Sequence, residues 1–401
     1  MKIKDVEVIF CSAGEILGDD LLKPIPGSGF EPRNWTFAKI TTDTGLVGWG
    51  EGTDYPGEDV IGFAAKELAR FIVGEDPLNI ERLWERMYAA AYGGTGKIYN
   101  CAISMIDHAL WDIAGKAFGA PVYNLLGGRC RDRIRLYGHI FLYNPTMGDG
   151  TYKKELEPWE DRAKQLKRDG YTALKMFGPM AAARINRTIT NKELRETVDA
   201  VKKVRDIVGD DIDICMDING RLDVLSAIKL CRALEPFNML FVEDPVRQDI
   251  GAEAMRRVKM STKTPICTGE NLYNVWGFQE YFDKNAVDII MPDLCHCGGI
   301  TQGKKIASMA WTYLAQFAPH NPNGPISSLV SAHVCASIPN FLVLEFVHPD
   351  VPYRDRIMTN PLKVKDGYLE LPATPGLGAD LIEKEIEKHP FRKMAFYGTY
   401  P

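Results

Sequence analysis

Three acidic residues follow short apolar runs at nearly equal spacing. Asp217 ends the run DIDICMD, while Glu243 and Glu270 lie at the ends of MLFVED and TPICTGE, so the steps are 243 − 217 = 26 and 270 − 243 = 27 residues. Steps of one strand and one helix would bring the three carboxylates together at one end of a parallel barrel. Crowded carboxylates need a cation, and all-oxygen ligands favour Mg²⁺ over zinc. Spacing alone also allows three unrelated acidic helix N-caps.

The same spacing continues to an acid and a histidine. Asp293 follows Glu270 by 293 − 270 = 23 residues, and His320 follows Asp293 by 320 − 293 = 27. A carboxylate on a neighbouring strand can hydrogen-bond one imidazole nitrogen and raise the basicity of the other, which makes a general base. A lone histidine is more often structural, but the register of His320 with the acidic series favours a catalytic role.

Short β-rich runs alternate with amphipathic stretches from Arg131 onward, which is typical of repeated βα units. Eight such runs predict a closed barrel with its chemistry at the C-terminal strand ends. On the second run, Lys175 and Phe177 share one face because neighbouring strand residues alternate, and Glu345 ends the eighth run. The runs are IRLYGH, TALKMF, DIDICMD, MLFVED, TPICTGE, VDIIMPD, AQFAPH and FLVLEF.

The first 130 residues have a different pattern. Strands are expected at Val6–Cys11, Trp35–Thr42 and Val47–Glu51, and the segment from Pro56 to Phe118 has helical periodicity, so this part is predicted to be an α+β domain. The long Gly/Pro-rich segment Gly14–Asn34 is interpreted as a functional loop, a lid. After Glu345 the chain is turn-rich, and GYLELPATPGLG is expected to form a hairpin returning to the first domain.

Charge and composition exclude several partner classes. The 48 basic and 53 acidic residues give a net charge of −5 without a basic stripe, so no nucleic-acid partner is expected. No apolar run approaches the roughly 20 residues of a membrane span, and MKIKDVEVIF lacks the apolar region of a signal peptide. Nine scattered cysteines without a C-x-x-C pair fit reduced thiols. We therefore expect a cytoplasmic protein with no membrane partner.

Several motifs resemble the mandelate racemase and muconate-lactonising branch of the enolase superfamily. They are AISMIDHALWDIAGKAFGAPVYNLLGG (Ala102–Gly128), MDINGR, FVEDP, TGEN, MPD and PH, in the family order. The resemblance implies an α/β fold, in which an α+β capping domain (1–130) covers a modified (β/α)7β barrel of the TIM type (131–365) and a C-terminal segment (366–401) returns to the cap. It also implies Mg²⁺ held by Asp217, Glu243 and Glu270, with a Lys or His base, an arrangement that enolase-superfamily sites share. A homo-oligomer is expected.

The chemistry that this resemblance implies is removal of the proton beside a substrate carboxylate. The resulting enediolate carries two negative oxygens, which a divalent cation and Lys175 can stabilise. Family members also place a carboxylic acid like Glu345 against the substrate carboxylate. His320, oriented by Asp293, is the predicted base. The expected partner is a small carboxylate, a sugar acid.

Two departures from the family pattern bear on the reaction. Racemases of this branch carry a second lysine where Phe177 stands, so one of two opposed bases is lost. Several dehydratases have a histidine where Asn219 stands, used to protonate the departing hydroxide. Either His320 acts twice in a syn elimination, or His296 or His139 donates that proton. Asn219 and Arg221, in the NGR motif, together with His296 and His139, are the candidate substrate-binding residues.

The motifs MPDLCHCGG, APHNPNGP and NGR resemble those of the sugar-acid dehydratases of this branch. The leading hypothesis is therefore a lyase that dehydrates a sugar acid (aldonate) to a 2-keto-3-deoxy acid. The second is an isomerase, either a cycloisomerase or an epimerase or racemase, that uses the same enediolate. The third is a non-catalytic protein that binds metal and ligand. Phe177 speaks against the racemase and Asn219 against a standard dehydratase, so the residues leave the choice open.

Overall fold

Eight parallel strands form the centre of the larger domain. This computed structural model describes residues 1–17, 21–23, 32–91, 96–140, 159–178, 186–347 and 350–394. Each strand from β6 to β12 pairs with the next, β13 returns to β6, and a bridge between Phe317 and Phe341 closes the ring. The strands are β6 (Arg133–Ile140), β7 (Ala173–Phe177), β8 (Asp213–Asp217), β9 (Phe241–Glu243), β10 (Ile266–Thr268), β11 (Ile289–Ile290), β12 (Gln316–Phe317) and β13 (Leu344–Glu345).

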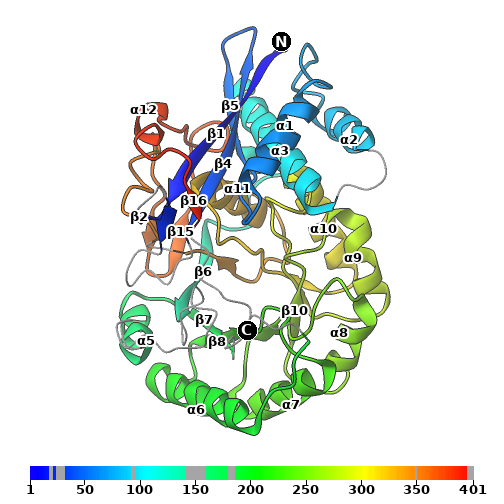
Figure 1. Ribbon diagram of the computed structural model, residues 1–401, viewed down its shortest axis with the longest axis vertical. Coiled ribbons are helices and arrows are strands. Elements are labelled where there is room, and N and C mark those ends of the chain that lie inside the picture. The colour runs from blue at the N-terminus through cyan, green and yellow to red at the C-terminus, as the bar shows by residue number, and fades with distance from the viewer. Residues whose placement is uncertain are drawn as a thin grey trace.

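One helix follows each of the first seven barrel strands, and in Figure 1 these helices form an arc around the sheet. They are α5 (Trp159–Arg168), α6 (Asn191–Val208), α7 (Val224–Leu234) with the short η1 (Glu235–Phe237), α8 (Ala252–Lys259), α9 (Asn274–Asp283), α10 (Gly299–Thr312) and α11 (Pro325–Ala336). Helix α6 begins with a capping box, in which Thr190 accepts the Glu193 N–H. Seven βα units and a final strand are the architecture that the sequence predicts.

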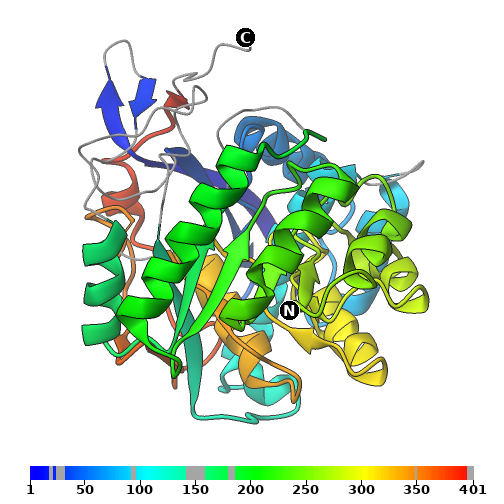
Figure 2. The same cartoon turned by 90° about the horizontal axis from the view of Figure 1, so that it is seen from below.

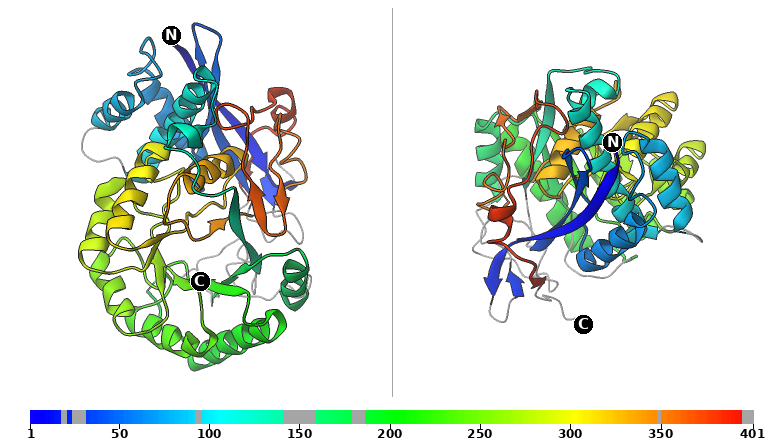
Figure 3. Two further views of the ribbon diagram at one scale, coloured as in Figure 1. Left: turned by 180° about the vertical axis from the view of Figure 1, so that it is seen from behind. Right: turned by 90° about the horizontal axis from the view of Figure 1, so that it is seen from above.

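The N-terminal part is an antiparallel sheet covered by helices. Strand β4 (Arg33–Thr42) lies between β1 (Ile3–Ala13) and β5 (Val47–Glu51), and α1 (Glu58–Ala69), α2 (Ile80–Ala90), α3 (Gly96–Ala117) and α4 (Val122–Leu125) follow. Helix α3 lies so close to β5 that a Cβ on Gly50 would collide with the Met105 carbonyl oxygen. Figure 3 shows this blue and cyan part beside the barrel, and in Figure 2 the green helices α6 and α7 lie in front of it.

The C-terminal segment joins both parts of the molecule. The hairpin of β14 (Val364–Lys365) and β15 (Tyr368–Glu370) pairs with β6 of the barrel, so the expectation that it lies on the first domain is wrong for these strands. The following turn does reach that domain, where Gly376 O accepts the Val122 N–H. Beyond α12 (Glu383–Ile386), β16 (Lys393–Met394) pairs with β3 (Leu21–Lys23), the partner of β2 (Glu15–Leu17).

The proposed lid and the domain boundaries stay predictions. Residues 18–20 and 24–31 of the proposed lid lie outside the described residues. The domain boundaries at 130 and 365 stay predictions. None of the helices in the described part of the chain is long and apolar enough to cross a membrane.

His333 on α11 holds two distant segments together. Its Nδ1 accepts the Tyr123 N–H at 3.1 Å, and its Nε2 donates to Leu377 O at 3.1 Å. The side chain is fully buried, and burial lowers the pKa of His333 to about 4 from its ordinary 6.5. Only a neutral ring can accept the Tyr123 N–H, so protonation would cost this contact.

This contact predicts a pH-dependent stability. The unfolded histidine takes up a proton below pH 6.5 and the folded one only near pH 4, so its contribution is full above pH 6.5 and is lost as the pH falls. By pH 5 the loss is about 2 kcal/mol in the free energy of unfolding. Urea titrations at pH 7.5 and 5.0 should show that His333→Gln is less stable than the unsubstituted protein at pH 7.5 but less sensitive to acid. An unchanged pH dependence in the variant would contradict this role.

Candidate active site

Parallel pairing places the predicted acidic residues at one end of the barrel. Phe177 is the register partner of Asp217, and Asp217 is the partner of Glu243 on the next strand. Further round, Asp293 and His320 form a parallel bridge. The C-terminal ends of all these strands meet at the same rim, where barrel enzymes carry out their chemistry.

Lys175 lies between carboxylates at the centre of this rim. Its side chain is 1% exposed, and its Nζ lies 3.2 Å from Asp217 Oδ2, 2.9 Å from Glu243 Oε2 and 3.2 Å from Glu345 Oε1. Burial lowers the pKa of Lys175, but the three nearby carboxylates outweigh burial and raise this pKa well above its usual value. Lys175 is therefore a fixed positive charge.

His320 and Asp293 form the predicted pair. His320 Nδ1 donates to Asp293 Oδ2 at 2.7 Å, and this leaves Nε2 directed at Glu270 Oε2, 3.1 Å away. Asn323 also donates to Asp293 Oδ2, at 2.9 Å. Burial lowers the pKa of His320, but Glu270, Glu345 and Asp293 outweigh burial and raise the pKa to about 10.

Glu345 connects the histidine pair with Lys175. Its Oε1 lies 2.8 Å from His139 Nε2, and its Oε2 accepts the Asn321 N–H at 3.0 Å and lies 3.7 Å from His320 Nε2. Although burial raises the pKa of Glu345, Lys175, His320 and His139 hold this pKa well below its usual value. Glu345 is thus ionised between two cationic groups.

Two aromatic rings lie near the Lys175 ammonium, in addition to the carboxylates. The Phe177 ring stacks on His139 with centroids 5.9 Å apart, and Lys175 Nζ lies 5.5 Å and 5.4 Å from the ring centroids of Phe177 and Tyr137. The Lys175 ammonium also donates to the Tyr137 hydroxyl at 3.4 Å. Tyr137 was not singled out from the sequence, although it stands two residues before His139 in IRLYGH and therefore shares its face.

The proposed metal ligands fit a hard cation by their chemistry. Burial, then Asp217, Glu345 and Glu270, raise the pKa of Glu243 well above its usual value, despite Lys175. The buried Glu243 Oε2 lies 2.9 Å from Lys175 Nζ but accepts no well-aligned hydrogen bond from the described residues. Such an acidic excess favours a bound cation, and carboxylate oxygens suit Mg²⁺.

The carboxylates of the three proposed metal ligands do not surround a common point. In the described part of the chain, no three acidic, histidine or cysteine side chains are arranged to hold one ion. Asp217 and Glu243 approach Lys175, whereas Glu270 approaches His320. Metal ligation by these residues therefore stays a prediction.

Asn219 contacts a proposed ligand. Its backbone N–H donates to Asp217 Oδ1 at 2.7 Å and its Nδ2 to Asp217 Oδ2 at 3.0 Å. The backbone of Asn219 has φ 50°, a left-handed conformation that asparagine tolerates. Arg221, half-buried in the same loop, bridges Val246 through its backbone, and no hydrogen bond or ion pair joins its side chain to the other candidates among the described residues.

His296 lies between the barrel and the N-terminal domain. Its Nδ1 is 3.3 Å from Glu270 O and its Nε2 is 3.2 Å from Thr53 O, while the side chain is buried. The position bridges the two parts of the molecule next to a proposed metal ligand. A role in substrate binding stays a prediction.

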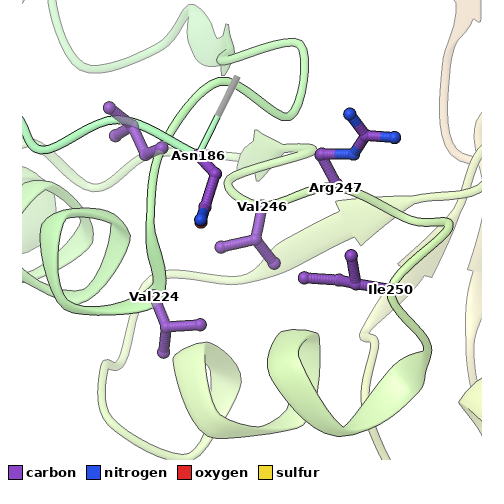
Figure 4. Close-up of a pocket in the computed structure, with 6 residues that line it drawn as sticks. Asn186, Val224, Val246, Arg247 and Ile250 are labelled. Carbon is purple, nitrogen blue, oxygen red and sulfur yellow. The ribbon is translucent and has the colours of Figure 1, made fainter. Parts of the chain in front are cut away.

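A separate cavity of about 270 Å³ lies among the segments that follow β7, β8 and β9. Figure 4 shows the apolar side chains of Val224, Val246 and Ile250 around it, with Asn186 and Arg247 at its edges. None of the candidate catalytic residues is among those that line it. The lining residues are Asn186, Leu222, Val224, Val246, Arg247 and Ile250.

Comparison with known proteins identifies the family. The model of the mandelate racemase/muconate lactonizing enzyme N-terminal domain matches residues 30–127, and that of the enolase C-terminal domain-like family matches 159–385. The chain belongs to the mandelate racemase/muconate lactonizing enzyme family. This membership confirms the resemblance and the predicted fold class, and the protein is an enzyme of the enolase superfamily.

Relatives within this family act on sugar acids. The chain is 33% identical to the D-xylonate dehydratase of Haloferax volcanii, over 88% of this chain and 85% of that protein. It is 34% identical to the D-galactonate dehydratase of Ralstonia pickettii, over 88% of this chain and 90% of that protein. The structure of the 3,6-anhydro-D-galactonate cycloisomerase from Zobellia galactanivorans superposes with a TM-score of 0.81 at 30% identity, covering 98% of this chain and 100% of that one.

The contact between Asn219 and Asp217 predicts an effect on metal affinity. Asn219→Gly keeps the left-handed backbone but removes the side-chain bond to the carboxylate, so Mg²⁺ should bind on the order of 10-fold more weakly. Asn238, with φ 52° at the end of η1, provides a matched control in Asn238→Gly. Calorimetric titration with Mg²⁺ measures the affinity of each variant for the ion. Equal affinity of the two variants would contradict the proposed orientation of Asp217.

Proposed function

We propose that this protein is a Mg²⁺-dependent dehydratase that converts a sugar acid to a 2-keto-3-deoxy acid. The observation that carries the proposal is the one-sided arrangement of the site, in which His320 is bonded to Asp293 and Phe177 stands where racemases of the branch have a second lysine. The names of the relatives, D-xylonate and D-galactonate dehydratase, support the substrate class.

His320 is the proposed general base. His320 acts in its neutral form, which Mg²⁺ bound at Glu270 would favour by offsetting a carboxylate charge that raises the pKa of His320. Its Nε2 then removes the proton at C2, and the electrons of the C–H bond move into the carboxylate to form an enediolate. Asp293, 2.7 Å from Nδ1, fixes the tautomer and stabilises the imidazolium that results. Because Phe177 offers no base on the other side, only one configuration at C2 should react.

Lys175 is proposed to stabilise the charge that develops on the substrate oxygens. It is held protonated by its neighbours and needs no rearrangement during the reaction, which is the condition for effective electrostatic catalysis. Members of the superfamily are generally Mg²⁺-dependent, and Asp217, Glu243 and Glu270 would hold the ion here. A bound Mg²⁺ supplies further stabilisation of the negative oxygens as a Lewis acid.

The departing hydroxide needs a proton, and we propose that His320 returns the one it has taken. Asn219 replaces the histidine of several dehydratases, and its amide donates to Asp217. His139 is bonded to Glu345 and stacked on Phe177. A syn elimination therefore uses one residue twice: the C3–O bond breaks, the hydroxide leaves as water, and the enol product tautomerises to the keto acid.

Cycloisomerisation is the second candidate, favoured by the structural similarity to the anhydrogalactonate cycloisomerase. It would begin with the same proton abstraction and end without loss of water. A screen of sugar acids with Mg²⁺ in D₂O, following keto-acid formation and deuterium incorporation by NMR, separates the two. A dehydratase gives a 2-keto-3-deoxy acid, and a product that retains every oxygen of the substrate would contradict dehydration.

Two substitutions test the proposed roles of the base and the lysine. His320→Asn should lose at least about 10²-fold in turnover and should also lose exchange of the C2 proton with solvent. Lys175→Met should slow turnover through weaker stabilisation of the enediolate. If His320→Asn still exchanges the C2 proton while Lys175→Met does not, Lys175 is the base and the assignment is reversed.

A further inference from the structure

A buried carboxylate of the N-terminal domain caps a barrel helix. Glu51, the last residue of β5, is fully buried, and its carboxylate accepts the N–H groups of Gly324 at 2.6 Å and Ser327 at 2.9 Å. These groups lie at the N-terminus of α11, where free N–H groups and the helix dipole favour a negative charge. Thr53 adds a hydroxyl donor at 2.7 Å.

Gly324 is the point of closest approach between the two domains at this contact. A Cβ built on this residue would lie 2.6 Å from Glu51 Oε1, so the carboxylate rests directly against the backbone. Burial raises the pKa of Glu51, and the hydrogen bonds from Thr53, Ser327 and Gly324 and the charge of Arg354 oppose that rise. The contact therefore depends on the absence of a side chain at Gly324 as well as on the charge of Glu51.

The segment that Glu51 holds also contacts the candidate catalytic residues. Between His320 and Gly324, Asn321 donates its N–H to Glu345 Oε2 and its Nδ2 to Glu345 O, each at 3.0 Å. Asn323 donates to Asp293 Oδ2, the oxygen that also accepts from His320 Nδ1. Movement of this segment would therefore change the orientation of the base.

The helix side of the contact reinforces this arrangement. The Ser327 hydroxyl donates to Asn321 Oδ1 at 2.8 Å, so the residue that donates its N–H to Glu51 also fixes the asparagine next to His320. Arg354 donates to Asn323 O from both terminal nitrogens, at 3.2 Å and 3.1 Å. Glu51 thus connects to His320 and Asp293 through hydrogen bonds that the backbone of residues 321–324 links together.

From this geometry we propose that Glu51 is a positioning residue for His320 and Asp293. It acts from the N-terminal domain by holding the 321–324 segment through Gly324 and Ser327. The inference rests on the proposed function, because it assumes that His320 is the base. It follows that the N-terminal domain completes the catalytic side of the barrel at this point, in addition to any role in covering the substrate.

The test compares Glu51→Gln with a buried carboxylate of the same domain. Glu51→Gln keeps the size but can accept only one of the two N–H groups well, so kcat should fall on the order of 10–100-fold. KM and the Mg²⁺ affinity should change little, because the strands that carry the proposed metal ligands are not held by this contact. Glu51→Asp, which retains the charge, should recover part of kcat.

Asp112→Asn is the matched control. Asp112 is also fully buried in the N-terminal domain, but its carboxylate accepts the N–H groups of Trp49 and Leu377 and does not contact the 321–324 segment. This variant should lose stability without a selective loss of kcat. The positioning role is wrong if Glu51→Gln keeps the kcat of the unsubstituted protein. It is also wrong if the loss in Glu51→Gln is unselective, with kcat, KM and Mg²⁺ affinity all impaired together.

A spectroscopic readout separates this inference from the proposed function. The His320 Nδ1 proton bonded to Asp293 should give a downfield NMR resonance, assigned by its absence in His320→Asn. Glu51→Gln should shift this resonance and speed its exchange with water, while Asp112→Asn leaves it unchanged. This result needs no substrate, so an unchanged resonance overturns the positioning role, whereas a protein without turnover of any sugar acid overturns only the proposed function.

Discussion

The excess of negative charge at one end of the barrel determines how the other groups of the site behave. Carboxylates from the ends of five barrel strands face this region with little solvent, and like charges in such a place are costly unless cations balance them. Lys175 and His320 provide part of this balance, which is why the pKa of each is raised although burial alone would lower it. The carboxylates are Asp217, Glu243, Glu270, Asp293 and Glu345.

This electrostatic constraint connects the fold with the proposed chemistry. A parallel barrel collects residues that are distant in sequence at one rim, and the acidic excess there attracts a metal ion as well as a proton. The replacement of a second lysine by Phe177 removes one cation and one base from the same site. The proposed base then stands on one side of the substrate only, which suits elimination better than racemisation.

The sequence was sufficient for the architecture and for the positions of the principal residues. The periodic steps from Asp217 to His320 predicted strand ends because each βα unit in a barrel has a similar length. Hydrogen-bond partners were harder to predict, since they depend on side-chain conformation and on distant segments. The bond of Asn219 to Asp217 needs a left-handed backbone, and that of Glu51 to Gly324 joins residues 273 positions apart. Similarly, the two strands of the final hairpin were assigned to the wrong domain because turn residues do not specify which strand a hairpin will join.

A crystal structure with Mg²⁺ and an unreactive sugar-acid analogue would test the central claim most directly. We predict one ion bound by Asp217, Glu243 and Glu270 at roughly 2.0–2.1 Å, with C2 of the analogue facing His320 Nε2 and its carboxylate oxygens near Lys175. An ion held elsewhere, or an analogue whose C2 hydrogen points toward Phe177 and away from His320, would contradict it.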